Sequence, residues 1–345
     1  MPDSAAVANP VNVGVVGAGR IGTSHAELLA RRVPGARLLA VADLCPGAAD
    51  RLASRLGCRA VANPAQLFED SDIEAVVIAA SSEAHTELIV AATAAGKAVF
   101  CEKPMGLTIA DVDQAIEAAQ AAGVALQVGF NRRFSADFAA ARQLVVDGKI
   151  GTPQLMRSLT RDPGLANPGG VPPWTIFLQT LIHDFDTLLW LNSGSNPTTV
   201  YAAADALVAP EFKDTGLLDT AMVMIKFDNG AIATAEASFS AGYGYDVRGE
   251  VFGSAGMATI GDVARTSMRY HSRHGRLADT VRSDVELFRD AYTAEFTEFT
   301  DAVRGRREPA VTGTDARRAL VLALASVESV KTGLPVSVVT IDRHD

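Results

Sequence analysis

Cysteine is scarce in this chain, and the few cysteines form no recognisable pattern. The three residues, Cys45, Cys58 and Cys101, are odd in number and include no CxxC pair or accompanying histidine. A disulfide framework needs paired cysteines, and a zinc site needs ligands at characteristic spacings. We therefore expect no disulfides and no metal, and thiols used in this way are typical of the reducing cytoplasm.

The chain also lacks a net positive charge and long apolar runs. The chain has 31 lysines and arginines against 40 acidic residues, which gives a formal net charge of -9 at pH 7. A nucleic acid partner calls for a basic face, so we expect none. No stretch approaches the ~20 apolar residues that span a bilayer. Residues 1–10 lack the basic start and apolar core of an export signal. We expect no membrane segment and a cytoplasmic location.

Apolar residues are otherwise plentiful. Hydrophobic residues make up 48% of the chain and charged residues 21%, a composition typical of a fully folded globular protein. Domains commonly have ~100–200 residues, so a chain of 345 residues predicts two of them. We place the division after Phe130, with one domain over residues 1–130 and the other over residues 131–345.

The first domain alternates β-branched runs with helical stretches, which is the pattern of a parallel sheet with crossover helices. Its strands are nearly all apolar, as strands buried on both faces must be. The expected strands are Val11–Val16, Leu38–Asp43, Ala75–Ala80, Ala98–Cys101 and Val124–Phe130. The expected helices are Ser24–Arg32, Glu83–Ala95 and Asp111–Ala122. This half is predicted to be an α/β Rossmann domain.

The second domain has a different texture. Thr220–Phe227 and Ala231–Phe239 alternate polar and apolar residues, and the intervening Asn229-Gly230 pair suits a type I′ hairpin turn. The other expected elements are helices at Ser135–Asp147, Ile176–Leu191, Phe288–Arg304 and Thr314–Lys331, and strands at Gln154–Arg161 and Val336–Ile341. We predict an α+β domain with a large open, mainly antiparallel sheet.

A complete GxGxxG, Gly17 to Gly22, directly follows the first strand and opens a helix. In that context Gly17 permits a tight turn, Gly19 lets a pyrophosphate approach, and Gly22 allows close packing of helix on strand. Asp43, at the end of the second strand, can accept hydrogen bonds from a ribose but repels a 2′-phosphate, and Leu44 supplies no compensating charge. The pattern predicts NAD rather than NADP, and the alternative is a glycine-rich turn with a capping aspartate.

Two further residues suit proton and oxygen chemistry. Lys103, in Glu102-Lys103-Pro104, follows a central strand, and open α/β sheets bind their ligands at this edge. A lysine there can stabilise a developing alkoxide, although a solvated surface lysine would fit the same pattern. His183 shares a helical face with Gln179 and Asp186 through i, i+4 and i+7 spacing, and a neutral histidine suits a general base. The alternative is a buried histidine with a structural role.

Taken in order, these segments resemble the glucose–fructose oxidoreductase, inositol dehydrogenase and MocA-like family, with the inositol 2-dehydrogenase branch the most similar. The segments that carry the resemblance are GAGRIG (17–22), Asp43, CEKP (101–104), GFNRRF (129–134) and IHDFD (182–186). The resemblance implies a catalytic Lys103, an acid/base His183 and dimers or tetramers built through the open sheet. Expected around the cofactor are Gly17, Gly19, Arg20, Ile21, Gly22, Asp43, Ser81, Glu102 and Lys103. Expected around the substrate are Asn131, Arg132, Thr160, Asp186 and Tyr245.

The sequence departs from that pattern at the active site. Inositol dehydrogenases usually carry Asp four residues before the catalytic histidine, where this chain has Gln179, and Thr160 stands where one related type has a histidine. We expect oxidation of a secondary ring hydroxyl of a cyclitol to a ketone. The alternatives are an enzyme for another sugar or amino-cyclitol, an NAD-dependent glycoside-cleaving enzyme and a non-catalytic NAD-binding sensor.

Overall fold

A computed structural model describes residues 9–165 and 167–343. The chain forms two compact units. Unit 1 comprises the described residues up to Asn131 together with Asp290–Arg317, and unit 2 comprises Arg132–Arg289 and the described residues from Arg318 onward. A segment late in the sequence thus belongs with the N-terminal residues, whereas the sequence placed it in residues 131–345.

Unit 1 is built on a six-stranded parallel sheet with the order β3-β2-β1-β4-β5-β6. This is the strand order of the dinucleotide-binding Rossmann fold. Its strands are β1 (Val11–Val16), β2 (Ala36–Ala42), β3 (Arg59–Val61), β4 (Ala75–Ile78), β5 (Ala98–Cys101) and β6 (Leu126–Val128). β4 and β5 are buried at every residue, which explains their wholly apolar sequences. The predicted Rossmann domain is therefore confirmed.

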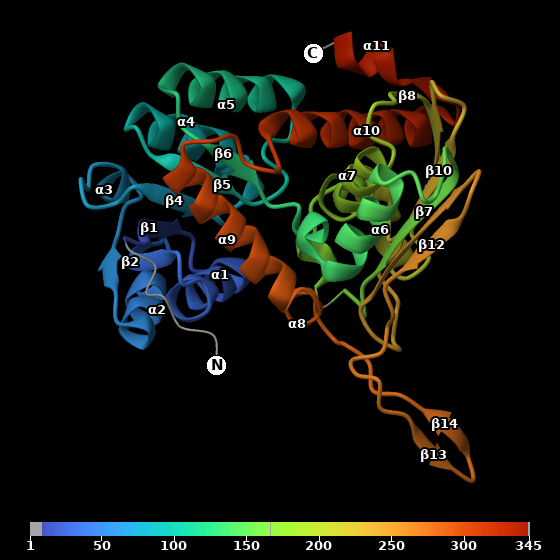
Figure 1. The fold of residues 1–345 in the computed structure, drawn as a ribbon, viewed down its shortest axis with the longest axis horizontal. Helices are drawn as coiled ribbons and strands as arrows, with labels where there is room; N and C mark the ends of the chain where they lie inside the picture. The colour runs from blue at the N-terminus through green and yellow to red at the C-terminus, as the bar shows by residue number, and fades with distance from the viewer. Residues whose placement is uncertain (1–8, 166, 344–345) are drawn as a thin grey trace. The chain divides into compact units, whose positions relative to one another are not determined.

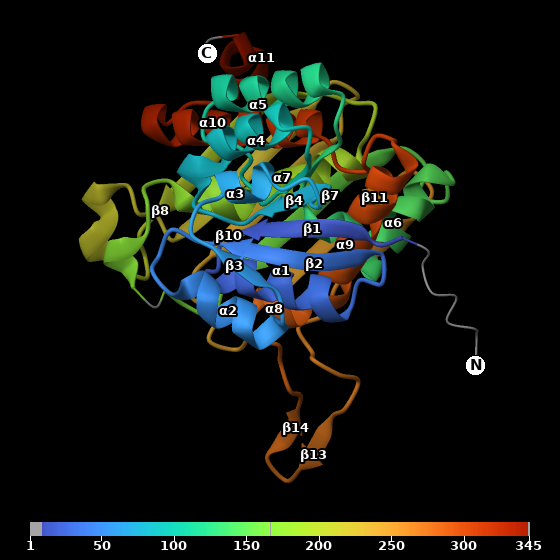
Figure 2. The ribbon, with the colours of Figure 1, turned by 90° about the vertical axis from the view of Figure 1, so that its left-hand side faces the viewer.

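Helices cover both faces of this sheet, with α1 and α2 on one side and α4 and α5 on the other (Figure 2). The helices of unit 1 are α1 (Arg20–Arg31), α2 (Ala48–Leu56), α3 (Ala65–Phe68), α4 (His85–Ala94), α5 (Ile109–Ala122) and most of α9 (Arg289–Gly305), with a short 3-10 turn η1 (Ser82–Ala84). α5 begins with a capping box between Thr108 and Asp111, and Gly123 ends it in the left-handed conformation.

Unit 2 contains a seven-stranded sheet with the order β12-β11-β7-β10-β9-β8-β15 (Figure 1). Neighbouring strands are antiparallel except for the parallel pair of β7 and β10. The strands are β7 (Pro153–Arg161), β8 (Pro197–Asp205), β9 (Thr220–Phe227), β10 (Ile232–Ser238), β11 (Asp246–Gly253), β12 (Met257–Ile260) and β15 (Val336–Ser337). A separate hairpin joins β13 (Tyr270–Ser272) to β14 (Gly275–Leu277). The predicted α+β domain with a mainly antiparallel sheet is confirmed.

Helices of unit 2 pack against that sheet, with α7 on β7 and β10 and α6 on β12. They are α6 (Ala136–Val146), α7 (Ile182–Leu191), α8 (Asp284–Leu287), α10 (Gly313–Thr332), which begins in unit 1, and α11 (Val338–Arg343). The short helical turns are η2 (Asn131–Phe134), η3 (Pro168–Gly170), η4 (Ile176–Leu181) and η5 (Pro210–Thr215). The segment predicted as one α-helix over Ile176–Leu191 begins instead with the π-helical turn η4.

Two further local predictions in unit 2 are wrong. The β9–β10 hairpin forms, but within its loop only Gly230 has a positive φ, +88°, and its N–H donates to Phe227 O. That geometry is a three-residue loop with a left-handed glycine rather than a type I′ turn. The predicted strand Val336–Ile341 ends at Ser337 and continues as α11. β15 pairs with β8 through Val336 and Ser337 only, and α11 begins at the next residue.

Candidate active site

The glycine-rich turn between β1 and α1 has little room for side chains at two of its three glycines. Gly17 has φ +103°, and a Cβ there would lie 2.4 Å from Ala79 O. A Cβ on Gly22 would lie 2.1 Å from Gly17 O. These two glycines therefore shape the turn and the packing of α1, as their spacing predicts.

Gly19 differs from both, because a Cβ at this position would meet nothing within 4 Å. It is the N-cap of α1 and has no side chain to satisfy the first N–H groups of the helix. Arg20 is exposed and Ile21 half-buried on the first turn. The turn thus presents open space at a helix N-terminus, where Gly19 has no side chain to cover the backbone, and such a position suits a pyrophosphate.

Asp43 follows β2 and is tied to the same turn. Its carboxylate accepts hydrogen bonds from the N–H of Ala18, at 2.6 Å, and from the N–H of Cys45, at 2.7 Å. A carboxylate offers about four acceptor positions, so two such bonds leave capacity for the hydroxyls of a ribose. Leu44, the next residue, is 79% exposed and supplies no positive charge for a 2′-phosphate. The residues present therefore fit NAD.

The segment Glu102-Lys103-Pro104 follows β5 at the carboxyl edge of the sheet of unit 1. Lys103 is half-buried, and the Lys103–Pro104 peptide bond is cis. Ser81 is exposed beyond β4, and Asn131 is buried beyond β6, so three neighbouring strands lead to predicted site residues. Ligands bind at this edge in open α/β sheets.

Glu102 is buried, and both of its carboxylate oxygens have partners. Oε1 lies 2.6 Å from His25 Nε2, and Oε2 accepts the N–H of Lys103 at 3.1 Å. Burial raises the pKa of this carboxyl, but His25 and Lys103 outweigh that effect, so the pKa lies below its ordinary value. Glu102 is therefore ionised at neutral pH and holds the backbone of Lys103.

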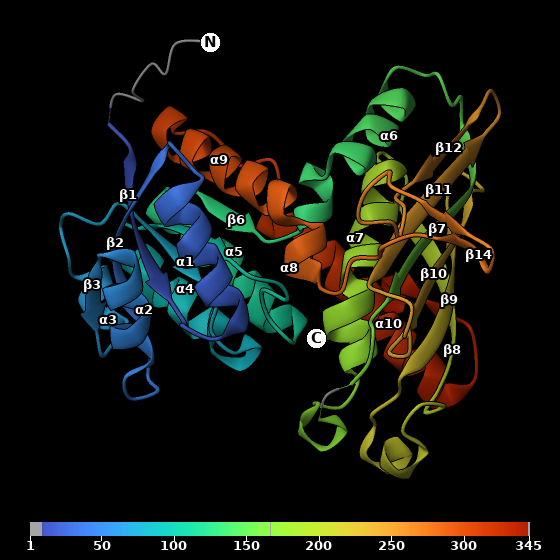
Figure 3. The same cartoon turned by 90° about the horizontal axis from the view of Figure 1, so that it is seen from below.

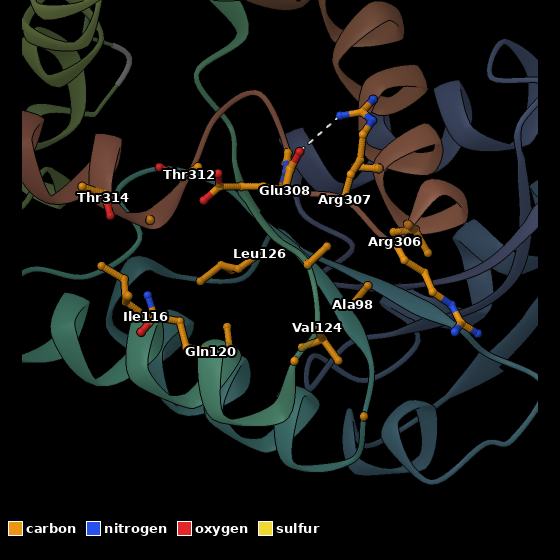
Figure 4. A pocket seen from close by; sticks show the side chains of 18 of the residues that line it. Ala98, Ile116, Gln120, Val124, Leu126, Arg306, Arg307, Glu308, Thr312 and Thr314 are labelled. Carbon is orange, nitrogen blue, oxygen red and sulfur yellow. Dashed lines mark hydrogen bonds between the residues drawn. The ribbon is translucent and has the colours of Figure 1, made fainter. Parts of the chain in front are cut away.

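A cavity of about 640 Å³ opens in unit 1 at the amino ends of β5 and β6. Its walls include Ile116 and Gln120 on α5, Leu126 on β6, and the chain that follows α9 (Figure 4). The described residues that line it include neither the glycine-rich turn nor Lys103. The candidate cofactor residues therefore lie at the opposite edge of the sheet from this cavity.

Unit 2 brings together a second group of predicted residues around α7. Gln179 lies on the π-helical turn η4, and His183 and Asp186 lie on α7. Single π-helical turns inside α-helices are frequently found at functional sites. The Asp186 carboxylate is buried and accepts the Nε–H of Arg133 at 2.9 Å. Arg133 thus orients Asp186, a contact that the sequence pattern did not indicate.

Arg132 and Thr160 meet in a buried polar network of unit 2. Arg132 donates to Asp184 Oδ1 at 2.7 Å, and Thr160 Oγ1 donates to Asp184 Oδ2 at 2.7 Å. Ser158 is hydrogen-bonded to both Arg132 and Asp184. Asp184 is fully buried, and the pairing supplies the charge that its burial requires. Neither Ser158 nor Asp184 was predicted as a site residue, because they join the network only through long-range contacts.

Tyr245 precedes β11, and its N–H donates to Val281 O at 2.8 Å. Burial raises the pKa of its hydroxyl well above the ordinary value, and the negative charges of Asp162 and Asp284 add to the effect. The hydroxyl therefore stays protonated and can donate a hydrogen bond throughout the physiological range.

No cluster of three or more histidine, cysteine or acidic side chains suitable for a metal ion is found in residues 9–165 and 167–343. Among the same residues, no helix is long and apolar enough to cross a membrane.

Comparisons with known proteins agree with both halves of the fold. Residues 11–130 match the model of the oxidoreductase family with an NAD-binding Rossmann fold, and residues 138–259 match the GFO/IDH/MocA C-terminal domain.

Individual relatives are similar over almost their whole length. The chain is 37% identical to a myo-inositol 2-dehydrogenase of Thermotoga maritima, covering 93% of this chain and 96% of that protein. It is 34% identical to a scyllo-inositol 2-dehydrogenase (NAD(+)) of Bacillus subtilis, over 94% and 96% of the two chains. A structure of scyllo-inositol dehydrogenase from Lactobacillus casei with bound NAD(H) and scyllo-inositol superposes with a TM-score of 0.89 at 30% identity, covering 96% of this chain and all of that one. The chain therefore belongs to the Gfo/Idh/MocA family of oxidoreductases.

Proposed function

We propose that this protein oxidises a secondary ring hydroxyl of a cyclitol to a ketone with NAD as the acceptor. The observation that carries the proposal is the arrangement at one edge of the sheet in unit 1. There the open glycine turn, the Asp43 carboxylate and Lys103 all follow strands of the same parallel sheet. The similarity to myo-inositol and scyllo-inositol 2-dehydrogenases supplies the substrate class.

The residues assigned to the cofactor have complementary tasks. The turn from Gly17 to Gly22 would hold the pyrophosphate at the N-terminus of α1, and Asp43 would accept the ribose hydroxyls. Bound NAD supplies the carbon that takes the hydride from the substrate. Lys103 is expected to donate a hydrogen bond from Nζ to the reacting hydroxyl oxygen, which stabilises negative charge as it develops there.

His183 is assigned the proton of that hydroxyl, which a ring nitrogen accepts as the ketone forms. Gln179, one turn earlier, is assigned the orientation of the histidine or of a substrate hydroxyl. Asn131, Arg132, Thr160, Asp186 and Tyr245 remain the proposed substrate-binding residues. Arg132 and Thr160 are hydrogen-bonded to Asp184 and to each other. We propose that this network also fixes the part of unit 2 that carries Asp186 and Tyr245.

We propose that Gln179 tunes His183 and partly decides which cyclitol the site accepts. An amide cannot place a negative charge beside an imidazolium, so His183 is expected to be a weaker base here than beside an aspartate. An epimeric inositol, an amino-cyclitol or another polyol is the second candidate.

A substrate panel tests the proposal. Purified protein is mixed with NAD and, in turn, with myo-inositol, scyllo-inositol, an amino-cyclitol and a hexose, and NADH absorbance is followed. We expect NADH to form with at least one cyclitol and faster than with the hexose. Product formation without net NADH would point instead to glycoside cleavage with transient oxidation. Cofactor binding without turnover of any substrate would contradict an enzymatic function.

We propose further that the protein is a homo-oligomer, a dimer or tetramer, assembled through the sheet of unit 2. Phe252, Leu155 and Ile232 lie in register on β11, β7 and β10, and Met224 pairs with Tyr201 on β9 and β8. Each of the five is at least 40% exposed, so apolar side chains lie on the solvent-facing side of the sheet, and Figure 3 shows α6 and α7 on its other side. A second copy of this chain covers such a face in a symmetric contact. Separately, the scarce and unpaired cysteines predict a cytoplasmic location, and this stays a prediction.

Leu155→Glu tests the oligomer, because a two-fold contact would bring two added charges together. We expect a smaller species by light scattering, with unchanged circular dichroism. Val146→Glu is the matched control, since Val146 is also exposed but lies on α6. Equal masses for wild type and Leu155→Glu would contradict this interface.

A further inference from the structure

Two buried histidines form hydrogen bonds to the segment that carries Lys103, one to the residue before the lysine and one to the residue after it. His25 contacts the side chain of Glu102, the residue before Lys103. His85 contacts the backbone carbonyl of Pro104, the residue after it. All five residues belong to unit 1. Neither histidine belongs to the candidate site that the sequence indicated.

His25 lies on the inner face of α1, three residues after Gly22, and is fully buried. Its ring packs edge-on against Phe100 of β5 and against Tyr292 and Phe296 of α9, at centroid distances of 6.0, 5.2 and 4.8 Å. Within the described residues, Nδ1 of His25 has no hydrogen-bond partner. The bond between Nε2 and Glu102 is therefore the single hydrogen bond that this side chain makes there. Because an ionised carboxylate only accepts, the proton of this 2.6 Å bond is carried by Nε2.

Glu102 connects His25 to Lys103. Glu102 accepts from His25 through Oε1 and from the N–H of Lys103 through Oε2. The carboxylate therefore links the helix that opens with the glycine-rich turn to the backbone of the lysine. Charge-assisted hydrogen bonds of this kind are short and directional, so they restrict the position of both partners.

His85 restrains the other side of the lysine. Its Nδ1 lies 2.7 Å from Pro104 O, and its Nε2 lies 3.2 Å from Ala80 O. Burial lowers the pKa of His85 below its ordinary value, despite the opposing effect of these two carbonyls. A neutral imidazole has one N–H, and the shorter distance assigns it to the carbonyl of Pro104.

We propose that His25 and His85 are positioning residues, which together fix Lys103 at the angle and depth that hydride transfer requires. The inference rests on the proposed role of Lys103. Neither histidine reaches the substrate in this proposal. Both act through the two neighbours of the lysine, so their loss would move Lys103 without removing it.

The test compares variants that remove each contact with variants that restore a donor. His25→Met and His85→Leu keep apolar volume but cannot donate, whereas His25→Gln and His85→Asn carry an amide N–H at a similar reach. Steady-state kinetics gives kcat and KM for the cyclitol found in the substrate panel, and fluorescence titration gives the Kd of NAD. Misplacing a reacting group by about 1 Å costs up to about 100-fold, so we expect kcat of His25→Met and His85→Leu to fall about 10- to 100-fold. We expect the Kd of NAD to stay within about threefold, and the amide variants to recover most of the kcat.

Lys97→Met is the matched control for lost stability. Lys97 is buried at the amino end of the same strand, β5, where its Nζ donates to Asp70 O and Ile73 O, both at 2.7 Å. We expect it to lower the melting temperature without lowering kcat. An equal loss of kcat in Lys97→Met would overturn the inference, because the effect would then follow general destabilisation.

Other results also decide the question. Wild-type kcat in both His25→Met and His85→Leu overturns the inference. So does a failure of His25→Gln and His85→Asn to exceed the kcat of the variants without a donor. If His25→Met does not fold, the comparison of His85→Leu with His85→Asn decides the matter. Lys103→Met separates the two levels: if it retains turnover, the proposed function of Lys103 fails, whereas an inactive Lys103→Met beside fully active histidine variants refutes the positioning role alone.

Discussion

Replacing Asp43 with asparagine should weaken the preference for NAD over NADP. The substitution keeps the shape of the side chain but removes its charge and one of its two acceptor atoms. In the structure both carboxylate oxygens accept backbone N–H groups, from Ala18 and Cys45. Asp43→Asn therefore perturbs the glycine-rich turn and the ribose contact together, and the two effects must be measured separately.

The size of each effect follows from the bonds involved. A hydrogen bond to a charged group contributes about 1.5–3 kcal/mol, so losing the ionic ribose contact should cost that amount. Since about 1.4 kcal/mol corresponds to a factor of ten, kcat/KM with NAD should fall about 10- to 150-fold. With NADP it should fall less or rise, because the repulsion of the 2′-phosphate by Asp43 is removed. Loss of one backbone contact should reduce the free energy of unfolding by about 1–3 kcal/mol.

The assay is initial-rate kinetics with both cofactors at saturating cyclitol, together with urea unfolding of each variant. Asp70→Asn is the matched control, since Asp70 Oδ1 accepts the N–H of Asp72 at 2.9 Å and repeats the contact of Asp43 with Cys45 two residues on. We expect Asp70→Asn to lose stability and keep the cofactor ratio. The double variant Asp43→Asn with Leu44→Arg should favour NADP further, because the exposed position of Leu44 can then offer a positive charge.

Two results would refute this assignment of Asp43. One is a wild-type enzyme with kcat/KM as high for NADP as for NAD. The other is an Asp43→Asn variant with lowered stability but an unchanged ratio between the two cofactors, since Asp43 would then serve the turn alone.

Three further outcomes are expected. Lys103→Met should bind NAD normally in a titration yet lose most turnover, and turnover within about fivefold of wild type would exclude its role at the reacting oxygen. Gln179→Asp adds a negative charge one turn before His183 and favours the imidazolium, so the acid limb of the pH profile of kcat/KM should move to higher pH. An unmoved profile together with unchanged relative rates on cyclitols would place Gln179 outside the active site. The pKa of Glu102 in the folded protein lies below its ordinary value, so the unfolded chain binds more protons at acid pH. Glu102 therefore stabilises the fold fully above its ordinary pKa, and this contribution to the free energy of unfolding is lost as the pH falls through the folded pKa. Glu102→Gln should therefore flatten the acid side of the stability curve measured by urea unfolding, and an unchanged slope would contradict the coupling to His25.

Features that depend on neighbouring residues can be predicted from the sequence. Three strands have in the structure the bounds that the sequence predicts: Val11–Val16, Ala98–Cys101 and Thr220–Phe227. The pattern of buried and exposed residues along a strand is written in consecutive residues, so it can be recognised in the sequence. The spacing of the glycine-rich turn is local as well, and the contact between Gly22 and Gly17 arises within it, whereas the tight space at Gly17 is set by Ala79, beyond β4. The Thr108 capping box likewise needs only residues three apart.

Contacts between polar groups that are distant in the sequence follow from the folded structure. His25 and Glu102 are 77 positions apart, and Arg132 and Asp184 are 52 apart, and no spacing in the sequence relates their side chains. Residues 338–341 likewise suit a strand by their β-branched side chains, but the pairing with β8 ends at Ser337 and α11 follows. Local propensity amounts to tenths of a kcal/mol per residue, whereas an unpaired buried charge costs several, so long-range packing sets these features.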